Sequence, residues 1–331
     1  MTLRRTLMLS ATLAASLLPA GAQAADINMV LNWVPTADHS PYFYAKSQGW
    51  YEEAGINLNI EAGRGSGAAA QRVGAGISQI GIADMATVLL SKSQGADAVA
   101  IMTVYANSPQ GFYWLKSGGI EGPEDFAGRS IGNPPADASR IMWPLFAETV
   151  GIAEDSVSFV NVSPQAKLAS LKSGAIDITS DFYNEHDLKV REFGEDLGFV
   201  AWRDIGINSY GLSVIVNGDF LEDNKEVVSQ FAAITQRAFA ACVENIDPCL
   251  EALMSEVSGL DHDNQRDQWN RITELMTDET TTTVALGAFS DERMKADYDM
   301  VETYFELEQP FDIKTVYTNE FLDESIKMPA N

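Results

Sequence analysis

Short apolar runs alternate with helical segments through the first two thirds of the chain, and this alternation limits the fold more than any other feature. The run at 56–60 alternates apolar and polar residues, as a half-buried strand does. Repeated strand and helix units predict an α/β fold with mainly parallel sheets flanked by helices. Helices are expected at 41–51, 68–73, 123–126, 137–150, 164–173 and 181–193. Strands are expected at 27–31, 56–60, 80–83, 99–105, 112–115, 157–162, 176–179, 199–202 and 210–216.

The chain beyond Gly218 has a different pattern. Apolar residues recur there at intervals of three and four, which marks one face of a helix. Further helices are expected at 227–239, 250–257, 265–276 and 292–307. At about 150 residues per domain, the chain of 331 residues suggests two domains. The sequence therefore predicts two α/β sets, the second starting near Phe112, and a helical C-terminal part.

The N-terminus carries the parts of a secretory signal in the usual order. Arg4 and Arg5 precede an apolar stretch at 7–18, and the small residues of Ala22-Gln23-Ala24 follow. A membrane anchor is the alternative, but the apolar stretch is shorter than the ~20 residues that span a bilayer. We therefore expect residues 1–24 to be a signal peptide, cleaved near Ala24, and the mature protein to be exported.

The charge balance limits the possible partners. The chain has 47 acidic and 22 basic residues, a formal net charge of −25. A surface this acidic repels the phosphates of nucleic acids and of anionic lipids. It also favours solubility without self-association, so a monomer that binds no nucleic acid is expected.

The cysteines and histidines are few. Cys242 and Cys249 lie on either side of an expected turn, and an oxidising compartment favours a disulfide between them. Two buried free thiols are the alternative. His39, His186 and His262 are far apart, and no Cys/His spacing matches a metal-ligand set, so no metal site is expected.

Four tracts resemble a known family. Leu-Asn-Trp-Val-Pro-Thr-Ala-Asp-His at 31–39 and the aromatic, Ala-Lys and Glu-Ala-Gly-Ile tract at 42–56 are similar to its start. Asp-Phe-Ala-Gly-Arg-Ser-Ile-Gly at 125–132 and Leu-Lys-Ser-Gly-Ala-Ile-Asp at 171–177 resemble later segments. The family comprises substrate-binding proteins of ABC importers, in the group for nitrate, sulfonates, taurine and pyrimidine precursors of thiamine.

This resemblance implies a periplasmic binding protein fold of type II-like architecture. Two α/β lobes would be joined by crossing strands, with a small-molecule ligand in the cleft between them. Lobe I would comprise residues 26–108 plus 213–331, and lobe II residues 109–212. The resemblance also implies a periplasmic location, a membrane permease as partner, and no cofactor.

The first loop narrows the resemblance to one branch. Its pattern at 32–39, Asn-Trp-x-Pro-Thr-x-x-His, is closest to proteins that handle pyrimidine precursors of thiamine, whose relatives include binders of riboflavin. Eukaryotic members that consume themselves to make the pyrimidine carry a cysteine-rich segment before the return strand. The corresponding stretch at 206–213 has no cysteine, which counts against such chemistry here.

Three candidate ligand-binding residues follow the first expected strand. Trp33 lies at the carboxyl edge, where open α/β sheets bind ligands, and its indole offers a stacking face. A tryptophan packed in the core is the alternative. Asp38 is either a helix cap or a ligand contact, and His39 is either a donor in the cleft or a structural imidazole.

Three more candidates belong to the first lobe or the first crossing. Asp84 is expected to cap the helix after 80–83, and it can also face the cleft. Tyr105 and Asn107 lie at the first crossing, where we expect them to line the hinge.

The second lobe contributes a further set. Asp181 is interpreted as a helix cap, and Asn184 and Glu185 are expected on the first helical turn, facing the cleft. A carboxylate there would pair with the amidine-like edge of an aminopyrimidine, although a solvated acid favoured by the helix dipole is the alternative. Tyr210 on the return strand is expected to stack or to hydrogen-bond.

Two segments bear on anion binding. The loop at 63–67, Gly-Arg-Gly-Ser-Gly, lacks the lysine of a nucleotide-binding loop and is interpreted as a ligand-facing loop in which Arg64 is solvated. An oxyanion binder would offer bare N–H groups and hydroxyls at the helix start near Asn133 and Ser139. This chain instead has Pro134 and Pro135, which lack the N–H, and Asp137.

Three functions are therefore compared. The first is an exported protein that delivers a small heteroaromatic ligand to an ABC importer. The second is an enzyme of the same fold, but the chain has no G-x-S-x-G, H-E-x-x-H or Cys-His signature, and no catalytic residue is assigned. The third is a binder of nitrate, taurine or alkanesulfonates. The aromatic and acidic candidates favour the first.

Overall fold

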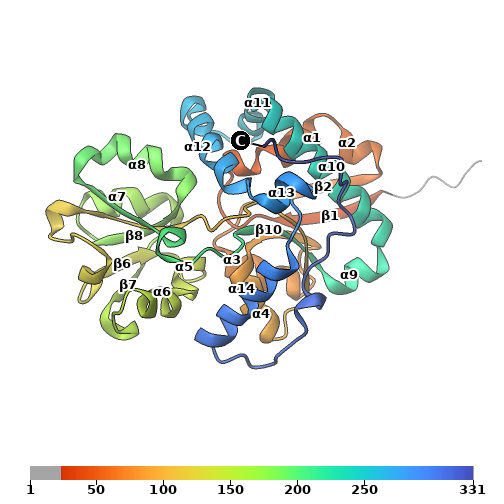
Figure 1. The fold of residues 1–331 in the computed structure, drawn as a ribbon. Coiled ribbons are helices and arrows are strands. Elements are labelled where there is room, and N and C mark those ends of the chain that lie inside the picture. The colour runs from red at the N-terminus through yellow and green to blue at the C-terminus, as the bar shows by residue number, and fades with distance from the viewer. Residues whose placement is uncertain (1–23, 331) are drawn as a thin grey trace, which may run out of the picture.

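The computed structural model describes residues 24–330 (Figure 1). The signal peptide predicted at 1–24 lies outside these residues, apart from Ala24 itself. No helix in the described range is long and apolar enough to cross a membrane.

Ten strands form two separate five-stranded sheets. In the first sheet the strand order is β2-β1-β3-β10-β4. Strand β10 runs antiparallel to both of its neighbours, while β1 runs parallel to β2 and β3. The strands are β1 Ala25–Val30, β2 Ile56–Glu61, β3 Ile80–Asp84, β4 Ala98–Thr103 and β10 Leu212–Asn217. The helices between them are α1 Ser40–Ser47, α2 Trp50–Glu53, α3 Ser66–Gly74 and α4 Met85–Ser93.

The second sheet repeats this arrangement, with the order β7-β6-β8-β5-β9. Here β5 is the strand that runs antiparallel to its neighbours. The aromatic rings of Phe112, Phe146 and Trp202 pack at its core. The strands are β5 Gln110–Leu115, β6 Ser130–Asn133, β7 Ser158–Asn161, β8 Ile178–Phe182 and β9 Leu197–Ala201. The helices are α5 Ala138–Ile141, α6 Trp143–Thr149, α7 Lys167–Lys172 and α8 His186–Phe193.

The C-terminal part is helical and returns to the first sheet (Figure 1). Phe231 and Phe239 of α10 pack against Tyr51 and Tyr42, each pair with ring centroids 5.4 Å apart. The helices are α9 Gly218–Asp223, α10 Lys225–Glu244, α11 Asp247–Glu256, α12 His262–Met276, α13 Glu279–Thr283 and α14 Asp291–Tyr304. Short 3-10 turns lie at Ala37–His39, Lys116–Gly118, Pro123–Phe126, Glu154–Ser156, Pro164–Ala166, Tyr183–Glu185, Gly194–Asp196, Trp202–Ile205 and Ile313–Thr315.

The chain passes between the sheets twice, at 104–109 and at 202–211. We call the part built on the first sheet, with the C-terminal helices, lobe I, and the part built on the second sheet lobe II. The boundaries proposed from the sequence, 108/109 and 212/213, lie at or next to these two crossings.

Three helices differ from those expected. The helix expected at 137–150 is two short helices, because Pro144 cannot donate the backbone hydrogen bond that would continue α5 into α6. The helix expected at 41–51 breaks at Gly49, whose φ of +72° leaves the helical region. The interpretation of Asp181 as a helix cap is wrong, since β8 continues to Phe182 and Asp181 pairs with two lysines instead.

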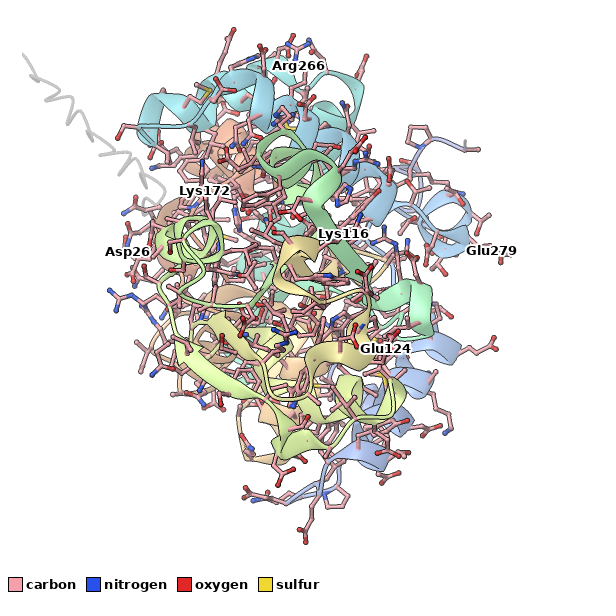
Figure 2. The ribbon with its side chains drawn as sticks, turned by 90° about the vertical axis from the view of Figure 1, so that its left-hand side faces the viewer. Asp26, Lys116, Glu124, Lys172, Arg266 and Glu279 are labelled. Atoms are coloured by element: carbon pink, nitrogen blue, oxygen red, sulfur yellow. A yellow bond between two sulfur atoms is a disulfide. The ribbon has the colours of Figure 1, made fainter. Side chains whose placement is uncertain are left out.

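Charged side chains project from the surface. Figure 2 shows Glu124, Lys172, Arg266 and Glu279 pointing outward, and all four are exposed. Glu124 and Glu279 are therefore solvated acids.

We expect the exported protein to contain no free thiol. Cys242 of α10 and Cys249 of α11 are joined in a disulfide, and the two residues are seven positions apart in the sequence. Replacing both cysteines with serine should lower the free energy of unfolding by about 2–3 kcal/mol, because the cross-link restricts the unfolded chain. Thiol titration of the denatured protein and urea unfolding measure the two effects. Two titratable thiols per chain would contradict the pairing.

Candidate functional site

The candidate site is a narrow cavity of about 40 Å³ between the two lobes. The carboxyl ends of β1, β6 and β8 point toward it, as ligand sites of open α/β sheets require. The lining residues are Asn32, Trp33, Thr36, Asp38, Gly65, Ser66, Gln110, Asp137, Ala138, Lys167, Ser180, Asp181, Phe182, Asn184 and Glu185.

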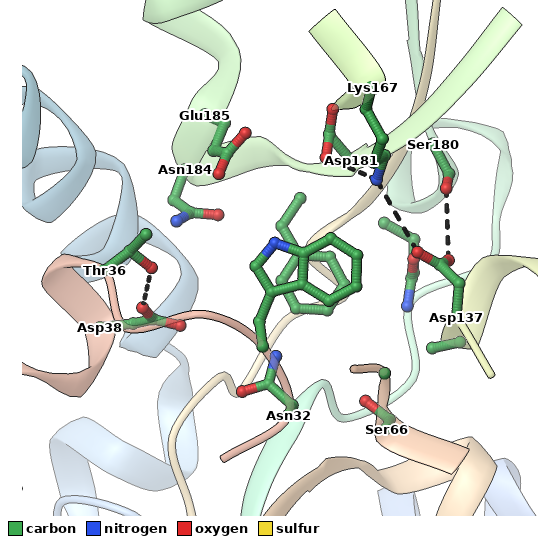
Figure 3. A pocket seen from close by; sticks show the side chains of 15 residues that line it. Asn32, Thr36, Asp38, Ser66, Asp137, Lys167, Ser180, Asp181, Asn184 and Glu185 are labelled. Carbon is green, nitrogen blue, oxygen red and sulfur yellow. Dashed lines mark hydrogen bonds and ion pairs between the residues drawn. The ribbon is translucent and has the colours of Figure 1, made fainter. Parts of the chain in front are cut away.

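Trp33 lines the cavity, whose side chains are drawn in Figure 3. Trp33 follows β1, and its backbone carbonyl accepts a hydrogen bond from the N–H of Gly63 at 2.9 Å. The carbonyl of Asn32 accepts another from the N–H of Gly65 at 2.7 Å. Two backbone hydrogen bonds from the glycine loop at 63–67 therefore hold the main chain from which the indole projects.

The glycine loop also lets the lobes touch. Gly65 has a φ of +122°, and a Cβ at this position would lie 2.1 Å from the carbonyl oxygen of Ala136 in lobe II. The N–H of Gly67 donates to that same oxygen at 3.2 Å. Only glycine allows this approach, so the loop serves the contact between the lobes. Gly65 and Ser66 line the cavity, whereas Arg64 is exposed outside it.

Asp38 is the buried carboxylate that lobe I contributes to the lining of the cavity. Asp38 accepts hydrogen bonds from Thr36 Oγ1 at 2.6 Å and from Tyr105 OH at 3.1 Å. Burial acts to raise the pKa of Asp38, but the neighbouring His39 and the two hydroxyls lower it below its ordinary value. The group is therefore ionised at neutral pH.

In lobe II, Asp181 lies between two lysines. Its Oδ1 accepts a hydrogen bond from Lys167 Nζ at 2.7 Å, and its Oδ2 lies 2.8 Å from Lys189 Nζ. The two lysine side chains are only 3% and 1% exposed. Burial acts to raise the pKa of Asp181, but the two ammonium groups hold it below its ordinary value.

Lys167 also faces the indole across the cavity. Its Nζ lies 4.9 Å from the centroid of the Trp33 ring and 3.8 Å from Asp137 Oδ2. Burial acts to lower the pKa of Lys167, yet Asp181 and Asp137 raise it above its ordinary value. A cation–π contact thus joins lobe II to lobe I.

Glu185 is a second carboxylate that pairs with Lys189. It ends the 3-10 turn after β8, and its Oε2 lies 3.3 Å from Lys189 Nζ. Burial raises the pKa of Glu185, Asp181 raises it further, and Lys189 and Lys167 only partly offset this. Its other oxygen, Oε1, has no hydrogen-bond partner among residues 24–330 and is available to a ligand.

Asn184 offers a second free acceptor. Its Nδ2 donates to Gln268 Oε1 at 3.2 Å. Its Oδ1 is buried and has no partner in the described part of the chain. Figure 3 shows this oxygen on the side of the amide that faces the indole, so it is directed toward a ligand in the cavity.

The charges at the cavity do not cancel. Four carboxylates line it, and only Lys167 and the underlying Lys189 oppose them, which leaves a formal net charge of −2. Unpaired buried charge is costly unless a ligand compensates it. The arrangement suits a planar ring that stacks on the indole and donates hydrogen bonds. No group of three or more His, Cys, Asp or Glu side chains in residues 24–330 is arranged to hold a metal ion.

Four of the residues expected from the sequence meet at this cavity, namely Trp33, Asp38, Asn184 and Glu185. His39 lies behind them, where its Nδ1 accepts from the Thr36 N–H at 3.1 Å and its Nε2 contacts Asn32 Oδ1 at 3.0 Å. It is therefore a structural imidazole and does not line the cavity.

Tyr105 and Asp84 also lie outside the lining. Tyr105 is fully buried and acts on Asp38 through its hydroxyl. Asp84 caps α4 by accepting from the Thr87 N–H, and it accepts from Gln110 Nε2 at 3.2 Å across the first crossing. Its carboxylate is thus used within the protein.

The last two expected residues hold the hinge. Asn107 Nδ2 donates to the carbonyls of Leu275 and Thr277, which ties the first crossing to the end of α12. The hydroxyl of Tyr210 accepts from the Ser290 N–H at 2.8 Å, and Tyr210 precedes β10. Neither side chain reaches the cavity, because both are committed to backbone groups of the C-terminal part.

Sequence reasoning missed Lys167 as a site residue and misread Asp181. Lys167 is 14 residues from Asp181, and no local pattern marks the two as a pair. The available signal was weak: a lysine in the first turn of a helix and an acid at the end of a buried strand.

Comparisons with known proteins identify the family of this chain. A sequence profile described as "NMT1/THI5 like" matches residues 36–247, which is more than half of the chain. The chain belongs to the NMT1/THI5-like family. The resemblance inferred from the first loop and the later segments is thereby confirmed.

Two curated relatives illustrate the range of this NMT1/THI5-like family. The formylaminopyrimidine-binding protein of Halalkalibacterium halodurans is 22% identical over 69% of this chain and 70% of its own length. A 4-amino-5-hydroxymethyl-2-methylpyrimidine phosphate synthase of Legionella pneumophila is 24% identical over 90% of this chain and 93% of its own.

A solved structure shows the same fold. The alkanesulfonate-binding protein SsuA of Xanthomonas axonopodis pv. citri matches with a TM-score of 0.69 at 12% identity, over 90% of this chain and all of that one. The expectation of a two-lobed α/β periplasmic binding protein fold is confirmed. At this identity the match bears on the fold alone.

We expect the free energy of unfolding of Asp297→Asn, compared with that of the parent, to increase as the pH rises from 4 to 7. Asp297 lies buried in α14 and accepts from the Tyr210 N–H, and burial raises its pKa to about 7, with nearby Asp84 opposing ionisation and Arg293 favouring it. Between pH 4 and 7 the unfolded chain loses this proton and the folded chain keeps it. The parent therefore loses up to about 1.4 kcal/mol of stability per pH unit from this group.

Urea unfolding of the parent and of Asp297→Asn at several pH values measures the difference. Subtracting the two curves cancels the other titrating groups. A difference that does not change with pH would show that Asp297 ionises normally in the folded protein.

Proposed function

We propose that this protein is a solute-binding protein that delivers a small nitrogen heteroaromatic compound to an ABC importer. A pyrimidine precursor of thiamine is the favoured ligand class, with riboflavin as a larger relative. In this proposal the ring stacks on Trp33, and the two N–H groups of its amino substituent donate to Glu185 Oε1 and Asn184 Oδ1.

The observation that carries the proposal is that an indole and free acceptors line the same cavity. The main chain at Trp33 is held by the glycine loop, and Asn184 Oδ1 is buried with no partner among residues 24–330. A buried acceptor without a donor is costly, and a ligand amino group removes that cost. The formylaminopyrimidine-binding relative is consistent with a ligand of this chemistry.

The alternative of a nitrate, taurine or alkanesulfonate ligand fits this cavity poorly. An anion needs unpaired N–H groups or cations. At the start of α5, Asp137 itself accepts from the N–H and the hydroxyl of Ser139. Lys167, the one cation that lines the cavity among the described residues, is already bound to Asp181.

We expect Trp33→Ala and Glu185→Gln each to weaken binding of a thiamine-precursor pyrimidine or riboflavin by roughly tenfold or more. Stacking contributes about 0.5–1.5 kcal/mol beyond burial, and a hydrogen bond to a charged group about 1.5–3 kcal/mol. Each tenfold change in affinity corresponds to about 1.4 kcal/mol. Titration calorimetry on the purified mature protein measures both variants.

Matched variants separate the site from the fold. Trp33→Phe keeps an aromatic face and should recover part of the affinity. Glu192→Gln changes an acid of α8, the helix that follows Glu185, outside the cavity and should bind as the parent does. If Glu185→Gln also binds as the parent does, Glu185 is only a solvated acid. If taurine or nitrate binds and no heteroaromatic compound does, the assignment to this branch fails.

An enzyme is the second candidate, because the Legionella synthase matches most of the chain. We propose that this chain is a binding protein and not an enzyme. The cavity carboxylates are engaged in ion pairs or hydrogen bonds, and the segment at 206–213 has no cysteine. Mass spectrometry after incubation with the pyrimidine should recover protein and ligand unchanged, whereas a mass change in either would favour the enzyme.

We further propose export to the periplasm, a membrane permease as partner, and a monomeric state. The mature protein should begin at Ala25 or Asp26, since the small-x-small pattern ends at Ala24 and β1 begins at Ala25. Mass spectrometry of the periplasmic fraction measures this. Recovery of protein that retains Met1 would argue against export.

A further inference from the structure

Outside the cavity, helix α8 of lobe II lies beside α12 of the C-terminal part (Figure 1). Their contacts are polar. Arg271 makes a bidentate pair with Asp187, with Nε at 2.9 Å and Nη2 at 3.0 Å from the two carboxylate oxygens. One turn along α12, Arg191 of α8 pairs with Asp267 and donates to Asn264 Oδ1 at 2.6 Å.

The contact residues are spaced to form one face on each helix. On α12 they recur at 264, 267, 268 and 271, and in lobe II at 184, 187 and 191. Residues three and four apart lie on the same side of a helix. The two rows belong to different lobes, because α12 packs against α11 and the turn Ala37–His39 of lobe I. They therefore meet across the cleft between the lobes.

This contact is continuous with the cavity. The turn that carries the cavity residues is held on both sides: Arg271 Nη1 donates to Tyr183 OH at 2.8 Å, and Arg271 also pairs with Asp187. Between them, Gln268 Oε1 accepts from Asn184 Nδ2. Because the amide nitrogen is engaged by α12, the amide oxygen of Asn184 is turned into the cavity.

We propose that the α8–α12 contact is a latch that holds the cleft closed and orients Asn184 for the ligand, with Arg271 and Gln268 as positioning residues. The part concerning the ligand rests on the proposed function. An exposed ion pair alone contributes little. Since these pairs exist in the closed state and not in the open one, their whole contribution shifts the equilibrium between the two states.

Arg271→Ala should test the latch against Arg266→Ala as control. Arg266 lies on the same helix, but its side chain is exposed and pairs with Asp247 of lobe I (Figure 2). Small-angle scattering without ligand should give a larger radius of gyration for Arg271→Ala than for the parent and for Arg266→Ala. Arg271→Lys should restore closure only in part, because lysine cannot form the bidentate pair.

The ligand readout uses 4-amino-5-hydroxymethyl-2-methylpyrimidine as the probe. Arg271→Ala and Asp187→Ala should each weaken its binding about three- to tenfold, mainly through faster dissociation. The double variant should be no weaker than either single one, because both remove the same pair. Gln268→Leu should weaken binding, and Gln268→Glu should retain it, since glutamate keeps an acceptor for Asn184 Nδ2.

The outcomes separate the two proposals. If the parent binds the probe and the latch variants match it in affinity, dissociation rate and radius of gyration, the latch is refuted and the proposed function stands. If the parent binds no heteroaromatic compound, the proposed function fails, and scattering without ligand still decides whether the latch exists.

Discussion

A buried ion network in lobe II is the interaction on which the candidate site depends. Asp181 is bound through both carboxylate oxygens by Lys167 and Lys189, and neither lysine is more than 3% exposed. Buried charges are tolerated when they are paired and hydrogen-bonded, and removing one partner of such a pair is costly. The network therefore holds the carboxylate of Asp181 in one position at the lobe II side of the cavity.

The other features of the cleft follow from this network. Lys167 reaches from the network to the Trp33 ring, and the glycine loop brings the two lobes into backbone contact at Gly65. The excess negative charge and the free oxygens of Asn184 and Glu185 then define a ligand that supplies donors and an aromatic face. The latch on α12 acts on the same turn of lobe II, so closure and ligand contact are coupled through a single segment.

Much of the fold could be predicted from the sequence. The apolar runs located nine of the ten strands in residues 24–330, because strand burial leaves a periodic trace in the chain, and the four-residue strand β6 was missed. The site was predicted only in part. Trp33 and Glu185 could be placed at sheet edges, but whether His39 or Tyr105 faces the cleft depends on side-chain partners distant in sequence. The Lys167–Asp181 pair left no local pattern for the same reason.

The central claim is that the cleft selects donor-rich, uncharged or cationic heteroaromatic compounds through its net negative charge. The most direct test compares two ligands that share one ring, 4-amino-5-hydroxymethyl-2-methylpyrimidine and its phosphate ester, by titration calorimetry on the parent protein. The account predicts that the alcohol binds and that the phosphate binds at least about 100-fold more weakly, since its negative charge meets a cavity lined by four carboxylates. Equal or tighter binding of the phosphate would contradict it.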